Sequence, residues 1–243
     1  MWKVLPWCAL PTGRIKLKMY SMKFIDWQTI DYKEAWDNQE TLFNKIIQTK
    51  KEGRSTRDLE TVFLCEHPHV YTLGKNGQVG NLLIHEEFLS KIKATYYKID
   101  RGGDITYHGP GQLVGYPILD LENYGGSLKK YIFKMEEAII QTLDYFGIHS
   151  TRLEGATGVW LEANTPVARK ICAIGVRASR FVTMHGFALN VNTDLSYFKY
   201  INPCGFIDKG VTSMQKELHK TIDMDTVKEV LTKNFKLNQQ TNN

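Results

Sequence analysis

One cysteine of this sequence stands in a turn that favours chemistry. Residues 202–205 read Asn-Pro-Cys-Gly, so Cys204 is flanked by a rigid proline and a flexible glycine. Structural cysteines usually lie inside apolar strands, as the sequence predicts for Cys65 and Cys172, whereas a cysteine in such a turn is more often exposed and reactive. The same residues also fit an ordinary tight turn with an inert thiol.

A lysine opens an apolar segment nearby in the sequence. Residues 168–177 read Ala-Arg-Lys-Ile-Cys-Ala-Ile-Gly-Val-Arg, and Lys170 begins the apolar part. An ammonium at the edge of a dry site can have a lowered pKa and can exchange protons with a neighbouring group. Lys170 is therefore a candidate acid–base residue, although a solvated surface lysine fits the same pattern.

A glycine-rich segment carries two further polar side chains. Residues 101–112 hold four glycines and one proline, together with Arg101 and His108. Consecutive glycines let backbone N–H groups approach a ligand closely. The segment has neither the GxxxxGK[ST] of a phosphate loop nor a GxGxxG before a helix, so a nucleotide loop is not predicted. A sharp turn between strands, with His108 as a structural residue, fits the composition equally well.

A fourth segment combines small and amide residues. Residues 184–192 predict an apolar strand with Asn190 and Asn192 on one face, and Gly186 and Ala188 leave room for a ligand against the backbone. Close packing between two strands is the alternative.

The spacing of apolar residues predicts the elements that must position these segments. Capping signals and helical periodicity indicate helices at residues 32–52, 84–92, 128–146 and 225–235. Apolar and β-branched runs indicate strands at residues 23–27, 61–65, 70–73, 95–99, 111–119, 157–161, 170–177, 181–184 and 187–191. Because strands and helices do not alternate regularly, a doubly wound parallel sheet is disfavoured. We predict an α+β fold in which helices pack on a mixed β-sheet.

Composition and length indicate a single domain. The chain has 243 residues, of which 42% are apolar and 23% charged, and no apolar run reaches the length of a membrane span. Residues 1–21 are basic, without acidic residues and without clear periodicity. We expect a non-essential extension or a misplaced start there, and a functional leader is the alternative. The folded domain is expected over residues 22–236, followed by a polar tail over residues 237–243.

Charge and cysteine content narrow the class of partner and the compartment. The net charge of +5 is mild, and no Lys/Arg block has interleaved aromatic residues, so nucleic-acid binding is not predicted. The charge would weakly steer an acidic macromolecular partner. The four cysteines form no CxxC, which gives little support to a zinc site or a disulfide scaffold. We expect free thiols in a reducing compartment.

Taken together, the four segments resemble the octanoyltransferases of lipoate biosynthesis, the lipoyl(octanoyl) transferase family. The family signature begins Arg-Gly-Gly and continues through Thr, an aromatic residue and His to Gly-Gln and a Tyr. It is matched here by Arg101, Gly102, Gly103, Thr106, Tyr107, His108, Gly111, Gln112 and Tyr116. Later motifs match at residues 170–171, 174–177, 185–192, 194–195 and 202–205. The four motifs in this order are highly specific, and the similarity covers about residues 22–235.

The resemblance implies a fold, a reaction and a set of site residues. The fold would be the catalytic domain shared by biotin and lipoate protein ligases. The reaction would move octanoyl from acyl carrier protein to a lysine of lipoyl domains of 2-oxoacid dehydrogenases or of the glycine cleavage H protein, in the cytoplasm and without ATP or a metal. Cys204 would be the nucleophile and acyl-thioester site, and Lys170 its acid–base partner. The substrate-binding residues would be Arg101, Gly102, Gly103, Asp104, Ile105, Thr106, Tyr107, His108, Ala173, Ile174, Gly175, Gly186, Phe187 and Ala188.

Three other functions remain open at this point. An ATP-dependent lipoate–protein ligase on the same fold would need an adenylate site and no cysteine nucleophile, which the Pro-Cys-Gly turn disfavours. A non-catalytic protein that binds acyl groups or lipoyl domains would not need Cys204. A papain-like thiol hydrolase would pair its cysteine with a histidine, and His185 and His219 are present, but neither stands in a recognisable setting.

Overall fold

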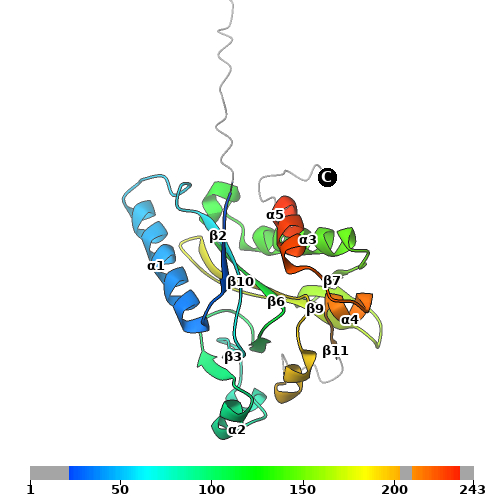
Figure 1. Cartoon of the computed structure of the whole chain (residues 1–243). Helices are drawn as coiled ribbons and strands as arrows, with labels where there is room; N and C mark the ends of the chain where they lie inside the picture. Colours follow the sequence, from blue (N-terminus) through cyan, green and yellow to red (C-terminus); the bar gives the residue numbers. More distant parts are fainter. Residues whose placement is uncertain (1–21, 203–209, 236–243) are drawn as a thin grey trace, which may run out of the picture.

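A computed structural model describes residues 22–202 and 210–235 of the chain (Figure 1). The predicted nucleophile Cys204 lies outside these ranges, as do the expected extension and tail. The described residues form a mixed β-sheet, a smaller sheet and helices packed around them, which confirms the α+β prediction. Within these ranges, no helix is both long and apolar enough to cross a membrane.

The main sheet runs in the order β1-β2-β6-β10-β9-β8-β7, and the short strand β11 pairs with β9. The pairs β1–β2 and β9–β11 are parallel, and the other neighbours are antiparallel. Its strands are β1 (Lys23–Thr29), β2 (Thr61–Glu66), β6 (Gln112–Ile118), β7 (Thr151–Leu153), β8 (Ala156–Leu161), β9 (Arg169–Ser179), β10 (Val182–Asn190) and β11 (Gly210–Val211).

A three-stranded sheet lies below the main sheet in the view of Figure 1. Its order is β4-β3-β5, with β3 (Val70–Leu73) parallel to β4 (Thr95–Lys98) and antiparallel to β5 (Ile105–His108). The 3-10 turns η1 (Val79–Asn81) and η3 (Leu195–Tyr200) and the helix α2 (Glu86–Lys91) adjoin this sheet.

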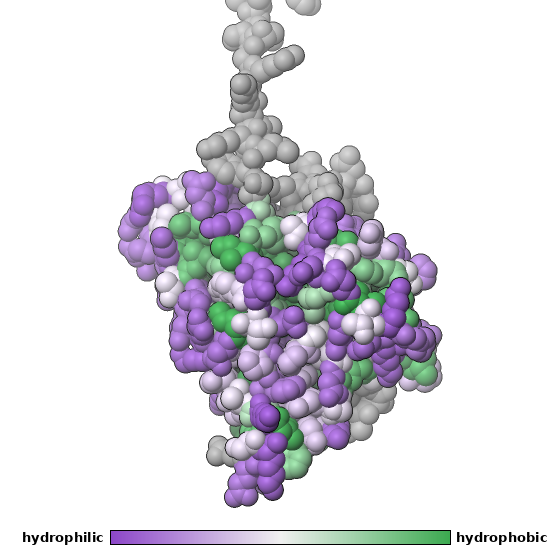
Figure 2. All heavy atoms as spheres, in the orientation of Figure 1, coloured by the Kyte–Doolittle hydropathy of each residue, from purple (hydrophilic) through white to green (hydrophobic). Residues whose placement is uncertain are grey.

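Helices cover both faces of the main sheet (Figure 1). The helix α1 (Tyr32–Lys51) packs on one face against β2, β6 and β10, whereas α3 (Leu128–Tyr145) and α5 (Met224–Asn234) pack on the other. Strand β10 is buried along its whole length because alternate side chains enter the two cores. Met184 and Ala188 join the α1 core, while Phe187 and Leu189 join the α3 core. Hydrophilic residues cover much of the outer surface seen in Figure 2.

The long helices begin where the capping signals predict. The Asp31 carboxylate accepts hydrogen bonds from the backbone N–H groups of Lys33 and Glu34, and the Ser127 hydroxyl accepts one from Lys130 N. Such caps each stabilise a helix by about 1 kcal/mol. The last helix, α5, begins earlier than expected because Asp223, rather than Asp225, provides the cap at Thr226 N.

The glycine-rich segment contains a strand that the sequence did not predict. Residues Ile105–His108 form β5, in which Tyr107 lies opposite Tyr71 and His108 opposite Val70 of β3. The flanking glycines and proline concealed this strand, which is stabilised by its non-local pairing with β3 and by the apolar cluster that buries Ile105 and Tyr107. The short elements β7, β11 and α4 (Met214–Leu218) were likewise not predicted, because segments of this length carry too little periodicity.

Two predicted strands are one. Residues 181–184 and 187–191 belong to the single strand β10. His185 lies in the middle of this strand with a left-handed φ of 59°, and Gly186 follows it. The irregular backbone at His185 and Gly186, rather than a loop between two strands, interrupts the strand pattern in the sequence.

Candidate functional site

A cavity of about 650 Å³ is lined by residues of both sheets. Loop 101–104 and strand β5 contribute from the smaller sheet, and β6, β8, β9, β10 and β11 contribute from the main sheet. The lining also includes Tyr32 at the start of α1, Leu128 and Ile132 at the start of α3, Phe198 of η3, and Asn76 and Gly155. The site is therefore assembled from segments that are far apart in the sequence.

The structure brings most of the predicted site residues to this cavity. The lining includes Lys170 together with Arg101, Gly102, Gly103, Asp104, Ile105, Thr106, His108, Ala173, Ile174, Gly175, Gly186, Phe187 and Ala188. Their shared location agrees with a common role, while the binding of an acyl chain by them stays a prediction.

Tyr107 is absent from the lining. Its side chain is buried in a separate apolar cluster with Tyr71, and its Oη lies 2.7 Å from Nδ1 of His69. Successive side chains of a strand alternate between faces, so Tyr107 lies away from its neighbours Thr106 and His108. The structure thus does not bring Tyr107 to the cavity with the other predicted residues.

Lys170 lies at the start of β9, with its backbone paired to β11. Val211 is its partner in that parallel pair, and Thr212 N donates to Lys170 O at 3.0 Å. The Lys170 ammonium lies 4.7 Å from the centre of the Trp160 ring. Phe198, which precedes Cys204 in the sequence, and Gly210, which follows it, also line this cavity. This holds Lys170 next to the strand that follows Cys204 in the sequence.

A chain of buried hydrogen bonds fixes the state of His108. Asn190 Nδ2 donates to the Thr212 carbonyl at 3.0 Å, and Gln112 Nε2 donates to Asn190 Oδ1 at 2.9 Å and to the Tyr107 carbonyl at 3.1 Å. Gln112 Oε1 must therefore accept from Nδ1 of His108, at 2.8 Å. The imidazole keeps its proton on Nδ1, and burial lowers its pKa to about 3. His108 is neutral at neutral pH.

A second buried histidine lies beside the first. His67 Nδ1 donates to the Ile30 carbonyl at 2.8 Å, so its Nε2 accepts from the Tyr116 hydroxyl at 2.7 Å. Burial lowers the pKa of His67 to about 4. Its ring lies 6.0 Å from that of His108. Tyr116 lines the cavity, so His67 supports the wall from behind.

A third histidine faces the cavity with a carboxylate partner. His185 Nε2 lies 2.9 Å from Asp100 Oδ1, and Arg177 pairs with the other oxygen of Asp100. Burial lowers the pKa of His185, and the hydrogen bond from His185 lowers the pKa of Asp100. The pair is therefore a neutral imidazole that donates to a carboxylate. His219, the other histidine considered from the sequence, is exposed at the end of α4 and is not part of the lining.

Loop 101–104 is fixed to both sheets. Arg101 Nη2 donates to the Thr72 carbonyl at 2.8 Å, and Gly102 N donates to the Val176 carbonyl at 2.9 Å. A Cβ on Gly175 would lie 2.8 Å from Gly102 O, so the loop lies directly against the backbone of β9. The glycine is needed here for close approach.

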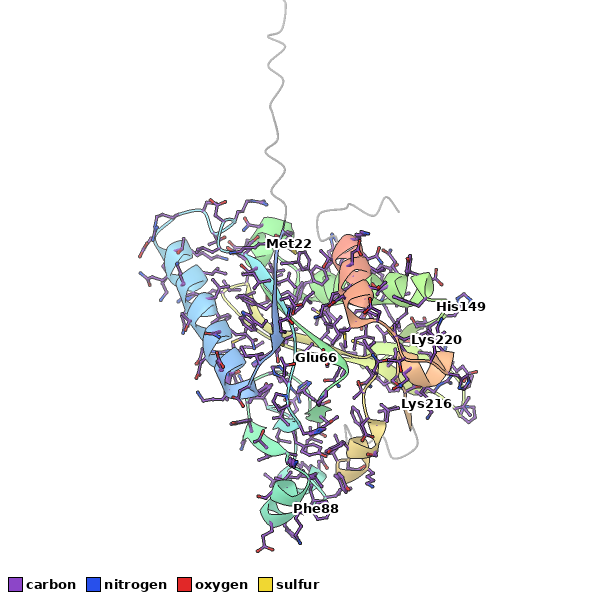
Figure 3. The ribbon with its side chains drawn as sticks, in the orientation of Figure 1. Met22, Glu66, Phe88, His149, Lys216 and Lys220 are labelled. Atoms are coloured by element: carbon purple, nitrogen blue, oxygen red, sulfur yellow. The ribbon has the colours of Figure 1, made fainter. Side chains whose placement is uncertain are left out.

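The turn before β6 is held by a carboxylate at the end of β2. Glu66, labelled in Figure 3, accepts a hydrogen bond from Gly111 N at 2.7 Å. Gly111 has a left-handed φ of 78°, and a Cβ there would lie 2.5 Å from the Asn192 carbonyl oxygen. The Gly-Gln of the sequence motif thus places Gln112 at the start of β6, within reach of His108.

Replacing Asn190 with alanine is expected to lower the free energy of unfolding by about 1–3 kcal/mol. The change leaves buried Gln112 Nε2 and the Thr212 carbonyl with one partner fewer. Urea denaturation monitored by circular dichroism measures the loss. The matched control is Asn44→Ala on the exposed face of α1, which should change stability by less than about 0.5 kcal/mol. Equal effects of the two substitutions would show that the buried chain adds no stability.

The stability of the fold should fall as the pH drops below about 6.5. His67 and His108 stay neutral in the folded chain down to about pH 4 and about pH 3, whereas histidines of the unfolded chain bind protons near pH 6.5. Between these values the unfolded state binds more protons, so stability present above pH 6.5 is lost on acidification, by on the order of a few kcal/mol. Urea denaturation at about pH 7.5 and about pH 5 tests this.

Two substitutions compare a buried histidine with an exposed one. His67→Gln should reduce the dependence of stability on pH, because it removes one buried titrating group. His149→Gln should leave that dependence unchanged, because the His149 side chain is 92% exposed (Figure 3). An unfolding free energy that does not vary between the two pH values contradicts the assignment of neutral buried imidazoles.

Several lining residues were not among the predicted substrate-binding residues. Strand alternation could have found some, since Gln112, Val114 and Tyr116 lie two apart in β6, and Asn190 follows Gly186 and Ala188 with the same spacing in β10. The lining residues Tyr32 and Trp160 lie outside the motifs in sequence, and only the tertiary fold brings them in.

Comparison with known proteins identifies the family. The lipoyl protein ligase A/B catalytic domain family matches residues 31–236. The octanoyltransferase of Bacteroides fragilis strain YCH46 is 60% identical over 206 residues, which cover 85% of this chain and 92% of that protein. The octanoyltransferase of Bacteroides thetaiotaomicron is 56% identical over 207 residues, covering 85% and 90%. The chain belongs to the octanoyltransferase family.

Solved structures of lipoate protein ligases share the fold of this octanoyltransferase family member. Lipoate-protein ligase A bound with ATP superimposes with a TM-score of 0.63 at 15% identity, over 88% of this chain and 84% of the other. A bi-partite lipoate protein ligase from Thermoplasma acidophilum gives a TM-score of 0.61 at 16% identity, over 88% and 82%. These similarities confirm the predicted lipoate protein ligase-like fold.

Proposed function

We propose that this chain transfers an octanoyl group from the thioester of acyl carrier protein to a lysine of a lipoyl domain, with Cys204 as the covalent nucleophile. The observation that carries the proposal is that one cavity gathers Lys170 with the glycine-rich loop and the small residues of β9 and β10. Relatives of 56–60% identity named octanoyltransferase support the same activity.

The cavity walls suit a medium acyl chain. Ala173 and Ala188, paired on neighbouring strands, give an apolar surface, and Gly186 exposes backbone where a side chain would take up space. An eight-carbon chain buried there would gain about 0.8 kcal/mol per methylene, or about 5 kcal/mol in all. That gain would favour octanoyl over much shorter acyl groups.

A Cys204–Lys170 pair would carry both half-reactions. The Lys170 ammonium favours the Cys204 thiolate, which attacks the octanoyl thioester carbon. The carbon–sulfur bond to the carrier breaks, and Lys170 donates its proton to the departing thiolate. Neutral Lys170 then removes a proton from the incoming lysine as its nitrogen attacks the acyl-enzyme, and the Cys204 thiolate leaves. The product amide is more stable than a thioester, so the overall reaction is thermodynamically favourable without ATP or a metal.

Both substrates in this scheme are carried by proteins. The donor is octanoyl-acyl carrier protein, and the acceptors are lipoyl domains of 2-oxoacid dehydrogenases and the glycine cleavage H protein. The net charge of +5 would favour an approach by acidic partners. A reducing compartment such as the cytoplasm would keep the Cys204 thiol available.

The direct test is the intact mass of the purified protein after mixing with octanoyl-acyl carrier protein in the absence of ATP. The expected result is one octanoyl adduct that hydroxylamine removes and that a lipoyl domain accepts. Labelling of the lipoyl domain only when free octanoate and ATP are supplied would instead indicate a ligase. Binding of the donor with neither adduct nor transfer would indicate a non-catalytic acyl-binding protein.

A further inference from the structure

We propose that Tyr107 and His69 are positioning residues for the nucleophile, because they hold the turn η3 and, through it, the chain that leads to Cys204. This inference rests on the proposed function, since it takes Cys204 as the nucleophile. Tyr107 belongs to the sequence motif but does not line the cavity, so contact with a substrate there does not explain its place in the motif. The contacts of its ring point to a different role.

The smaller sheet presents one face to the cavity and the opposite face to η3. In β5, Thr106 and His108 line the cavity, and Tyr107 between them lies on the opposite face. Tyr71, its partner in β3, is fully buried beside it. The aromatic side chains of η3 pack against the apolar cluster that these two tyrosines belong to. The sheet therefore separates the cavity from the turn and contacts both.

Three side chains form the contact between the sheet and the turn, and we call them the aromatic anchor. The Tyr197 ring of η3 stacks on the His69 ring at 4.2 Å and on the Tyr107 ring at 4.9 Å, with interplanar angles of 7° and 12°. Tyr107 Oη lies 2.7 Å from His69 Nδ1, and Tyr197 Oη lies 3.3 Å from His69 Nε2. Each of the three side chains thus contacts both of the others.

The rest of η3 is fixed to the same face of the sheet. Tyr71 Oη donates to the Tyr197 carbonyl at 2.9 Å. The Phe198 ring packs edge-on against the Tyr107 ring at 5.4 Å, and Phe198 also lines the cavity. A change in the position of Tyr107 would therefore move the turn as a whole.

The chain leaves η3 toward Cys204 along a second fixed contact. Ile201 forms an antiparallel bridge with Leu82, and Asn202 N donates to the Asn81 carbonyl at 2.8 Å. Asn202 stands two residues before Cys204, and two residues of chain span at most about 7 Å. The position of η3 and of the residues that follow it therefore limits where the nucleophile can lie.

The chain after Cys204 is fixed beside Lys170. Gly210 N donates to the Ala168 carbonyl at 3.0 Å, and Val211 pairs with Lys170 across the β9–β11 pair. Both ends of the segment must be held to set the distance from Cys204 to Lys170. Strand β11 holds the later end, and the aromatic anchor holds the earlier one.

A double-mutant cycle between the aromatic anchor and Lys170 tests the proposal. Tyr107→Leu removes the ring stack and should lower kcat for octanoyl transfer by about tenfold or more, because a small misplacement of a reacting group costs up to about 10²-fold. The KM for octanoyl-acyl carrier protein should stay within about twofold, since Tyr107 does not line the cavity. In the Tyr107→Leu protein, Lys170→Ala should slow iodoacetamide alkylation of Cys204 much less than it does in the unaltered protein.

A conservative variant separates the ring from its hydroxyl. Tyr107→Phe keeps the stack on Tyr197 and removes only the hydroxyl that contacts His69, so kcat should stay within about fivefold, the worth of one hydrogen bond. If Tyr107→Leu does not fold by its circular dichroism spectrum, Tyr197→Leu takes its place in the cycle. Tyr197 is only partly buried, so its replacement disturbs the core less.

Tyr96→Leu is the matched control. Tyr96 pairs with Tyr71 in the same sheet and packs against the same apolar cluster, but none of the ring contacts to η3 among the described residues involves it. It should change kcat and alkylation by less than about twofold.

Two results would overturn the positioning role and leave octanoyl transfer intact. One is a Lys170→Ala effect on alkylation that is equally large with and without Tyr107→Leu. The other is a Tyr107→Leu protein whose KM rises while its kcat is unchanged. A wild-type protein that forms no octanoyl adduct overturns the proposed function itself.

Discussion

Replacing Cys204 with alanine is expected to remove both the covalent octanoyl adduct and the transfer of octanoyl to a lipoyl domain. Without the thiol no acyl-enzyme forms, and direct attack by a lysine would lack the covalent route. The rate should fall by a factor on the order of 10³ or more. Intact mass after mixing with octanoyl-acyl carrier protein reads the adduct, and the mass of the lipoyl domain reads the transfer.

The matched control is another cysteine that the mechanism does not use. Cys8→Ala lies in the expected non-essential extension and should leave adduct and transfer unchanged. The buried Cys65 and Cys172 are poorer controls, because their replacement would leave cavities in the core. An adduct of full yield in Cys204→Ala would rule out Cys204 as the acyl carrier.

The second large effect is expected for Lys170. Lys170→Ala should slow both half-reactions by about 10²–10⁴-fold, because it removes the cation that favours the thiolate and the group that exchanges the proton. Single-turnover formation of the adduct and its discharge to a lipoyl domain measure the two steps separately. The rate of iodoacetamide alkylation of Cys204 near neutral pH reports thiolate formation and should also fall.

Lys170→Arg separates the two roles of the lysine. Arginine keeps the positive charge but does not give up its proton, so alkylation should recover more than acyl transfer does. Lys216→Ala, which removes an exposed lysine of α4 (Figure 3), should alter neither rate. Alkylation kinetics that are the same in Lys170→Ala and the unaltered protein would exclude charge stabilisation of the thiolate.

The sequence predicted those features of the fold that depend on interactions between neighbouring residues. Asp31 and Ser127 provide caps where their side chains reach free N–H groups of the first helical turn, and this depends only on nearby residues. The predicted site residues likewise form slightly less than half of the cavity wall. By contrast, β5 requires β3 as a partner, and Tyr107 within it turns away from the cavity because of strand alternation. Pairing across the chain determines both, so local patterns did not reveal them.

The buried amides illustrate the same limit inside the site. Gln112 was part of a motif, but its link through Asn190 to the strand beside Lys170 depends on β6 lying next to β10. His185 was considered as a possible partner for a cysteine, and only the fold shows that Asp100 accepts from it. The sequence therefore drew attention to these polar residues, but only the fold shows which of them are joined by hydrogen bonds.

The strand order also has a consequence for how the chain is made. Strand β6 is buried along its whole length and pairs on one side with β2 and on the other with β10. During synthesis β2 and β6 are complete first, while β10 follows roughly 70 residues later, which takes several seconds at ribosomal speeds. In that interval an apolar strand edge is open to pairing with other chains. The cavity wall that β6 and β10 form together is therefore completed only late in synthesis.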